Sequence, residues 1–190
     1  MDKWKREPLD SDEIEACISA CDGVVERAAI VTLADTGMRK NELLSMRRDW
    51  VDFDKGILTI HVRKDYKEGE NIQTKARGPK TKVERRIPMS ERLTNALKAF
   101  FKGHGRFTYT PKQLWVLCVK VGKLSGTEKR VTPHIFRHSF ITRAFYVGGL
   151  KPIEISKLSG HANAKMVEEV YLHVDEDETA KKLKESGFLG

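Results

Sequence analysis

Apolar residues recur with helical spacing along most of this 190-residue chain, and this pattern limits its fold more than any other feature. In the first such stretch they are spaced i, i+3, i+4 and i+7, as on one face of a helix: Ile14, Cys17, Ile18 and Cys21. Only two short segments, 57–62 (ILTIHV) and 87–89 (IPM), are typical of strands. We therefore predict an α+β fold that is mostly α-helical, with a small antiparallel β-sheet in the first half.

Capping residues and glycines indicate where the helices begin and end. Asp10 or Ser11 starts the first helix, and the sequence DTG at 35–37 stops a mostly apolar second helix that begins near residue 22. Thr132, with Pro133 at the first helical position, starts a helix that contains the sequence HIFRHSF. The other expected helices are a short one with Arg39 and Glu42 on one face, two near 90–102 and 111–121, one ended by Gly160, one capped by Asn163 and one in the tail.

The charge of the chain favours a polyanionic partner, nucleic acid first. Its formal net charge is +8, and residues 75–86 (KARGPKTKVERR) hold six Lys/Arg against one acidic residue. The three cysteines are sparse and lack zinc-ligand spacing, no apolar run could span a bilayer, and residues 1–10 lack the apolar core of a signal peptide. We expect a reducing, intracellular compartment.

His134 and Arg137 lie three residues apart, directly after the expected helix start at Thr132. A helix N-terminus presents unpaired N–H groups and a partial positive charge, so it attracts anions. Adding an imidazole and a guanidinium there predicts a phosphate site. A capping or ion-pairing role is the structural alternative for these two side chains.

Considered together, the candidate residues are suited to phosphoryl transfer without a metal. Arginines grip non-bridging phosphate oxygens in pairs, lysine and histidine move protons, and tyrosine supplies a nucleophilic oxygen. Singly, each residue has a structural explanation, such as a surface ion pair, a solvated hairpin or a core contact. The set comprises Arg39, the basic run at 75–86, His134, Arg137, His161 and Tyr171.

Four blocks in this order resemble the catalytic domain of the tyrosine recombinase (phage integrase) family: 35–46 (DTGMRKNELLSM), 79–89 (PKTKVERRIPM), 132–142 (TPHIFRHSFIT) and 157–174 (KLSGHANAKMVEEVYLHV). The resemblance implies the catalytic residues Arg39, Lys80, His134, Arg137, His161 and Tyr171, with Glu42 in support. It makes Tyr171 the nucleophile. DNA contacts are expected from Lys75, Arg77, Lys82, Arg85 and Arg86.

The chain departs from the family pattern in two places. The gap from His161 to Tyr171 is one residue longer than usual, and residues 64–78 form an apparent insertion before the lysine. Lys80 fits the family spacing best because it lies eight residues before Pro88, and Lys82 remains the alternative. Tyr66 and Tyr146 are alternative nucleophiles.

The resemblance implies a site-specific recombinase or integrase that cuts and rejoins double-stranded DNA through a 3′-phosphotyrosyl intermediate. It implies no cofactor, no metal and no membrane, a homotetramer on recombining DNA, and a monomer or weak oligomer when free. The expected compartment is the cytoplasm of a prokaryotic cell, with the gene carried by the cell, a virus or a plasmid. The alternatives are type IB topoisomerase-like relaxation of DNA, or a non-catalytic DNA-binding protein with the same fold.

For the domain organisation we expect one catalytic domain over 1–190. Residues 1–10 would be a linker remnant or N-terminal arm, and residues 175–190 a tail that docks on a neighbouring subunit. The N-terminal core-binding domain of the family is expected to be absent.

Overall fold

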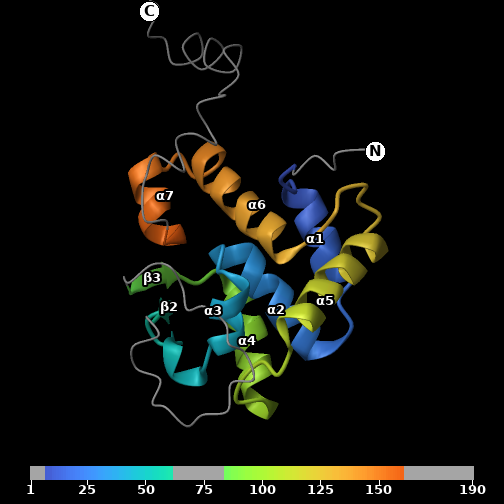
Figure 1. Ribbon diagram of the computed structural model, residues 1–190. Coiled ribbons are helices and arrows are strands. Elements are labelled where there is room, and N and C mark those ends of the chain that lie inside the picture. Colours follow the sequence, from blue (N-terminus) through green and yellow to red (C-terminus); the bar gives the residue numbers. More distant parts are fainter. Residues whose placement is uncertain (1–6, 62–83, 161–190) are drawn as a thin grey trace, which may run out of the picture.

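The computed structural model describes residues 7–61 and 84–160 of the chain (Figure 1). Within these ranges helices dominate, and three short strands lie between the third and fourth α-helices. In chain order the elements are α1 (Ser11–Ser19), α2 (Gly23–Thr36), α3 (Lys40–Ser45), the 3-10 helix η1 (Arg48–Trp50), β1 (Val51–Asp52), β2 (Ile57–Ile60), β3 (Arg85–Pro88), α4 (Glu91–Gly103), α5 (Pro111–Leu124), α6 (Pro133–Tyr146) and α7 (Pro152–Ser159). The predicted α+β fold class is confirmed.

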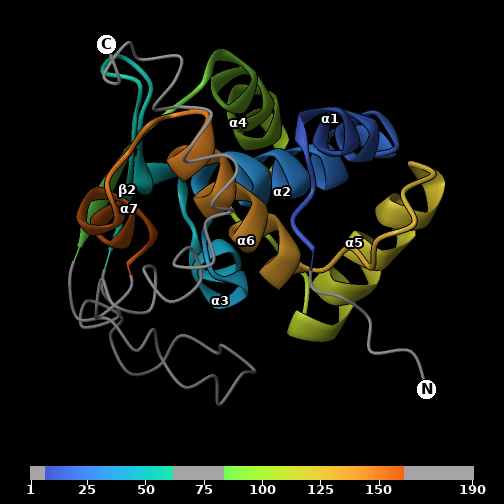
Figure 2. The same cartoon turned by 90° about the horizontal axis from the view of Figure 1, so that it is seen from above.

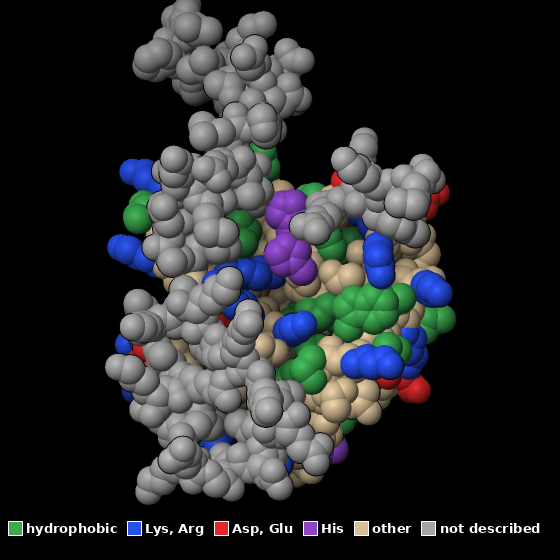
Figure 3. Space-filling view, in the orientation of Figure 1, with side chains coloured by type: hydrophobic (Ala, Val, Ile, Leu, Met, Phe, Trp, Pro, Cys, Tyr) green, Lys and Arg blue, Asp and Glu red, His purple; other side chains and the backbone are tan. Residues whose placement is uncertain are grey.

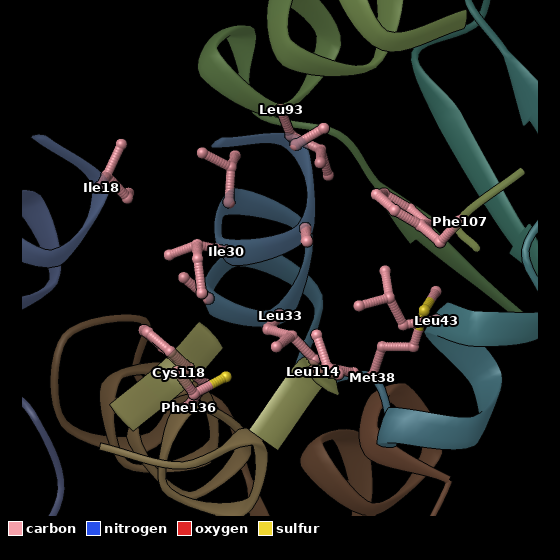
Figure 4. Close-up of a cluster of buried hydrophobic side chains, with 14 of the residues drawn as sticks. Ile18, Ile30, Leu33, Met38, Leu43, Leu93, Phe107, Leu114, Cys118 and Phe136 are labelled. Carbon is pink, nitrogen blue, oxygen red and sulfur yellow. The ribbon is translucent and has the colours of Figure 1, made fainter. Parts of the chain in front are cut away.

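Helix α2 lies at the centre of the molecule, and α1, α4 and α6 pack against it (Figures 1 and 2). Because neighbours surround it, α2 is apolar on nearly every side, and Ile30 and Leu33 are fully buried. Figure 4 shows these side chains among others from α4, α5 and α6, such as Leu93, Leu114 and Phe136. One apolar core therefore holds the helices that carry the site described below.

The strands form an antiparallel sheet in the order β1-β2-β3, so the small antiparallel sheet predicted for the first half of the chain is confirmed. Leu58 of β2 pairs with Ile87 of β3, and both side chains are buried. Helix α7 packs against β3, so the sheet lies beside the end of the described chain (Figure 1).

Most of the predicted helix ends are confirmed. Asp10 caps α1 by accepting from the backbone N–H of Glu13, and Thr132 caps α6 with Pro133 in its first turn. Gly160 ends α7 in the left-handed conformation. The helix expected after Asn163 and the helix expected in the tail lie outside the described residues.

No helix within 7–61 and 84–160 combines the length and the apolar character needed to cross a bilayer.

Gly122 provides a test of the packing between α5 and the segment that leads into α6. A Cβ at Gly122 would lie 2.4 Å from Cγ2 of the buried Val131. Gly122→Ala should therefore lower the free energy of unfolding by about 1–3 kcal/mol, the usual effect of overpacking, although alanine favours helices. Urea unfolding measures this value.

The matched control is Gly103→Ala at the end of α4, where an added Cβ meets nothing within 4 Å. This variant should be as stable as the unchanged protein or slightly more stable. A Gly122→Ala protein that matches the control would contradict the packing described for α5.

Candidate active site

The turn between α2 and α3 places the first two site residues. Gly37 ends α2 in the left-handed conformation, and Arg39 follows as the extended N-cap of α3. Oε2 of Glu42 accepts the Arg39 backbone N–H at 2.7 Å, which satisfies one of the unpaired donors at the helix start. Arg39 and Glu42 thus contact each other, but Arg39 caps the short helix instead of lying within it as expected.

The Glu42 carboxylate is the centre of the site. Its side chain is 3% exposed and accepts hydrogen bonds from two terminal nitrogens of Arg85, at 3.0 Å on Oε1 and 2.5 Å on Oε2. Nη1 of Arg39 also donates to Oε1, at 3.2 Å. Burial alone would raise the pKa of the Glu42 carboxyl, but the hydrogen bonds and charge of Arg85, together with Arg39, hold this pKa below its usual value.

Arg39 also connects α3 to the end of α7. Its Nη2 donates to the backbone oxygen of Gly160 at 2.7 Å. A Cβ at Gly160 would lie 2.8 Å from Nη1 of Arg85 and 3.3 Å from Nη1 of Arg39, and the φ angle there is +69°. Glycine is therefore required at this position by its conformation and by the two guanidinium groups that lie over it.

Arg137 reaches the same cluster from α6. Its Nη1 donates to the backbone oxygen of Gly37 at 2.7 Å, and its residue surface is 6% exposed. The ring of Phe140 lies against Gly37, where a Cβ would come within 2.4 Å of Cδ1, so α6 approaches this turn closely. Burial, and then the nearby charge of Arg39, lowers the pKa of Arg137 to about 9. The group is still protonated at neutral pH, and an anion beside it would be stabilised.

His134 lies in the first turn of α6, three residues before Arg137, and it is exposed. Figure 3 shows histidine side chains beside a group of Lys and Arg side chains on the face that α6 crosses in Figure 1. The structure thus brings Arg39, Glu42 and Arg137 together and places His134 at the exposed start of the same helix. Three guanidinium groups and one carboxylate meet here, counting Arg85, which gives the cluster a surplus of positive charge suited to a phosphate.

Several predicted site residues lie outside the described part of the chain: Lys75, Arg77, Lys80, Lys82, His161 and Tyr171, and the alternative nucleophile Tyr66. His161 directly follows Gly160, the residue whose carbonyl oxygen Arg39 holds. The other alternative nucleophile, Tyr146, ends α6 and packs partly buried with a small apolar cluster around Ile141 and Ile155. Within 7–61 and 84–160, no three His, Cys, Asp or Glu side chains come together as metal ligands would.

Arg85 does not lie where a DNA contact was expected. Its side chain is 6% exposed and both terminal nitrogens are bonded to Glu42, so it serves the interior of the site instead of the surface. Its neighbour Arg86 is exposed, as a DNA contact requires. Strand alternation was the signal that we missed, because Arg85 shares a face with the buried Ile87.

The comparison with protein families agrees with this geometry. A family model described as the phage integrase family matches residues 7–178. The chain belongs to the phage integrase family. The family predicted from the four sequence blocks is therefore confirmed.

Curated relatives of this phage integrase family member include two tyrosine recombinases. XerA of Pyrococcus horikoshii is 28% identical over 192 residues, which cover 94% of this chain and 59% of XerA. XerD of Listeria monocytogenes is 28% identical over 189 residues, which cover 87% of this chain and 57% of XerD. The chain thus spans less than two thirds of the length of these relatives.

Solved structures share the fold. A structure of the Tn1549 transposon integrase in complex with a circular intermediate DNA superposes with a TM-score of 0.74 at 23% identity, covering 97% of this chain and 67% of that chain. A crystal structure of XerA recombinase superposes with a TM-score of 0.73 at 22% identity, covering 95% of this chain and 65% of that chain. The described helices and sheet are therefore those of this family's fold.

Glu42→Gln tests the role of the buried carboxylate in stability. Removing its charge leaves Arg85 buried without a counter-charge, so the free energy of unfolding at pH 7 should fall by about 3–5 kcal/mol. Because the pKa of Glu42 is lowered in the folded protein, its stabilising effect is present above the ordinary glutamate pKa of about 4.3 and is lost as the pH falls below it. Urea unfolding between pH 7 and pH 3.5 should therefore show that the free energy of unfolding falls less with decreasing pH in the variant than in the unchanged protein.

The exposed Glu128 supplies the control, since the free energy of unfolding of Glu128→Gln should fall with decreasing pH as much as that of the unchanged protein. Equal pH dependence in Glu42→Gln and the unchanged protein would show that Glu42 is not stabilised as its contacts indicate.

Proposed function

We propose that this chain cuts and rejoins DNA strands as the catalytic part of a site-specific recombinase. The observation that carries this proposal is the cluster in which Glu42 holds the guanidinium of Arg39 while Arg137 lies beside it, with His134 at the exposed end of the same helix. Two arginines with a buried supporting acid are suited to one phosphodiester group. The names of the relatives, tyrosine recombinases XerA and XerD, support the same reaction.

The proposed reaction is a transesterification at a backbone phosphate. The Tyr171 oxygen attacks the phosphorus and loses its proton, a 3′-phosphotyrosyl bond forms, and the bond to the 5′ oxygen breaks. Lys80, or Lys82 as the alternative, gives the departing 5′ oxygen a proton, so that a 5′-hydroxyl leaves. Attack by the 5′-hydroxyl of a partner strand reverses these steps, and the ester conserves the bond energy.

The arginines stabilise the charge that develops on the non-bridging oxygens during this attack. Arg137 is held by the Gly37 oxygen and Arg39 by Glu42 and the Gly160 oxygen, so both groups are oriented before DNA arrives. A group that is already oriented costs no reorganisation during the reaction. His134 and His161 are proposed to donate to the same phosphate or to move protons.

Double-stranded DNA is the proposed substrate. The Tn1549 integrase, which shares the fold, was solved with a circular intermediate DNA, and an XerH recombinase of the same fold was solved with its difH substrate. By its family membership we propose that the chain assembles as a tetramer on recombining DNA. The exposed Arg86 and the basic run at 75–82 are the proposed backbone contacts.

A nicked duplex that traps the covalent intermediate tests the proposal. A pool of random-sequence duplexes, each nicked just downstream of the cleavage point so that the short fragment carrying the new 5′-hydroxyl diffuses away, is incubated with the protein. The DNA attached to the protein is then isolated and sequenced. Tyr171→Phe should abolish attachment, because one hydroxyl is the whole nucleophile. Tyr146→Phe, at the end of α6, is the matched control and should attach DNA like the unchanged protein.

Attachment that survives in Tyr171→Phe but not in Tyr146→Phe would move the nucleophile to α6. No attachment by the unchanged protein would favour a non-catalytic DNA-binding protein. Relaxation of supercoiled plasmids that lack the captured sequence would favour the topoisomerase-like alternative.

A further inference from the structure

We infer that Arg85 is a positioning residue of this site: it orients the Glu42 carboxylate and offsets its charge, so that Arg39 presents its positive charge to the phosphate. The inference rests on the proposed function, because it takes a phosphodiester as the ligand of Arg39. Arg85 belongs to β3 and lies 43 residues from Glu42 in the chain, so the fold alone brings the two together.

The geometry of the Arg85–Glu42 contact supports this role. The two terminal nitrogens of Arg85 each bond one oxygen of Glu42, at 3.0 and 2.5 Å, and such a paired contact fixes the plane of the carboxylate. The same two oxygens accept from Arg39, through Nη1 at 3.2 Å and the backbone N–H at 2.7 Å. Turning the carboxylate would therefore turn or release the Arg39 guanidinium.

Arg39 and Arg85 differ in their exposure to solvent. The Arg39 side chain is 27% exposed, whereas that of Arg85 is 6% exposed. Among residues 7–61 and 84–160, Arg85 Nε has no hydrogen-bond partner, so Glu42 is the group that holds this guanidinium. A phosphate can reach the partly exposed Arg39 from solvent, whereas Arg85 is nearly fully buried against Glu42, which makes Arg85 a positioning residue and not a catalytic one.

Arg85 also changes the net charge of the cluster. One carboxylate beside one arginine forms a neutral pair, and a neutral pair attracts a phosphate weakly. With Arg85 present, the three guanidinium groups of Arg39, Arg85 and Arg137 and the one carboxylate of Glu42 carry a surplus of two positive charges, and without Arg85 the surplus falls to one. Arg137 experiences this surplus, because Arg39 and Arg85 both disfavour its charged form.

The experiment compares two linkages at the cleavage point of a nicked duplex captured by the unchanged protein. One is the ordinary phosphodiester, and the other is a methylphosphonate, in which a methyl group replaces one charged non-bridging oxygen and the linkage is neutral. Arg85→Gln removes the charge of Arg85, and Arg85→Lys keeps it. The rate of covalent attachment is measured in a single turnover, at equal amounts of folded protein.

On the phosphodiester, Arg85→Gln should react about 10–100-fold more slowly, the effect typical of removing the outer partner of a metal ligand, and Arg85→Lys should recover part of the rate. On the methylphosphonate, the loss in Arg85→Gln should largely disappear, because the neutral linkage needs less positive charge. Arg85→Met is made alongside, so that a folded variant without the charge is at hand if the glutamine variant does not fold.

Arg92→Gln is the control for a merely structural role. Arg92 is also held by carboxylates, those of Asp35 and Glu15, but in a network between α4, α2 and α1 that shares no residue with this cluster. The Arg92→Gln variant should be less stable than the unchanged protein but should attach to both linkages at the same rate as the unchanged protein. A loss in Arg85→Gln that is equal on the two linkages, or no loss at all, would overturn the inference. A lack of attachment by the unchanged protein would contradict the proposed function itself, and the inference with it.

Discussion

The pairing of the buried Glu42 carboxylate with Arg85 and Arg39 is the interaction on which the rest of the site depends. Placing a carboxylate in an apolar interior is costly unless it is paired and hydrogen-bonded, and here Arg85, the Arg39 side chain and the Arg39 backbone N–H all donate to it. These donors come from the start of α3 and from β3. One ionised group therefore joins the sheet to the helical core and orients an arginine at the protein surface.

Two glycines extend this arrangement to the other helices. The backbone oxygen of Gly37 accepts from Arg137, and that of Gly160 accepts from Arg39. Both glycines have positive φ angles, and in both a Cβ would collide with a side chain of the site region. The helix ends formed by α2 and α7 thus serve as acceptors for the arginines, and the chemistry of the site depends on backbone shape as much as on charged side chains.

Much of this structure could be predicted from the sequence, because its signals are local. Helical spacing, the caps at Asp10 and Thr132, and the stop at Gly160 place most helices within a few residues of where they lie. The order of the four motif blocks predicted the family, since each block carries residues at a fixed spacing. The same blocks predicted Arg39, Glu42 and Arg137 as site residues, and the fold brings these three together.

The partner of Glu42 could not be predicted in the same way, because pairing between residues 43 positions apart is decided by the fold. The net charge of the basic run suggested a solvent-facing Arg85, whereas strand alternation with Ile87 turns it inward. The position of Arg39 as a cap depends on the turn at Gly37, whose close contact with Phe140 comes from α6 and not from neighbouring residues.

The central claim is that Glu42 acts on the phosphate through Arg39, and a double-mutant cycle tests it most directly. Covalent attachment to the captured nicked duplex is measured for the unchanged protein, Glu42→Gln, Arg39→Ala and the double variant, at equal amounts of folded protein. The account predicts that Glu42→Gln slows the unchanged protein strongly but has little further effect once Arg39 is removed. An equal slowing by Glu42→Gln in both backgrounds would show that the two residues act independently, and would contradict the account.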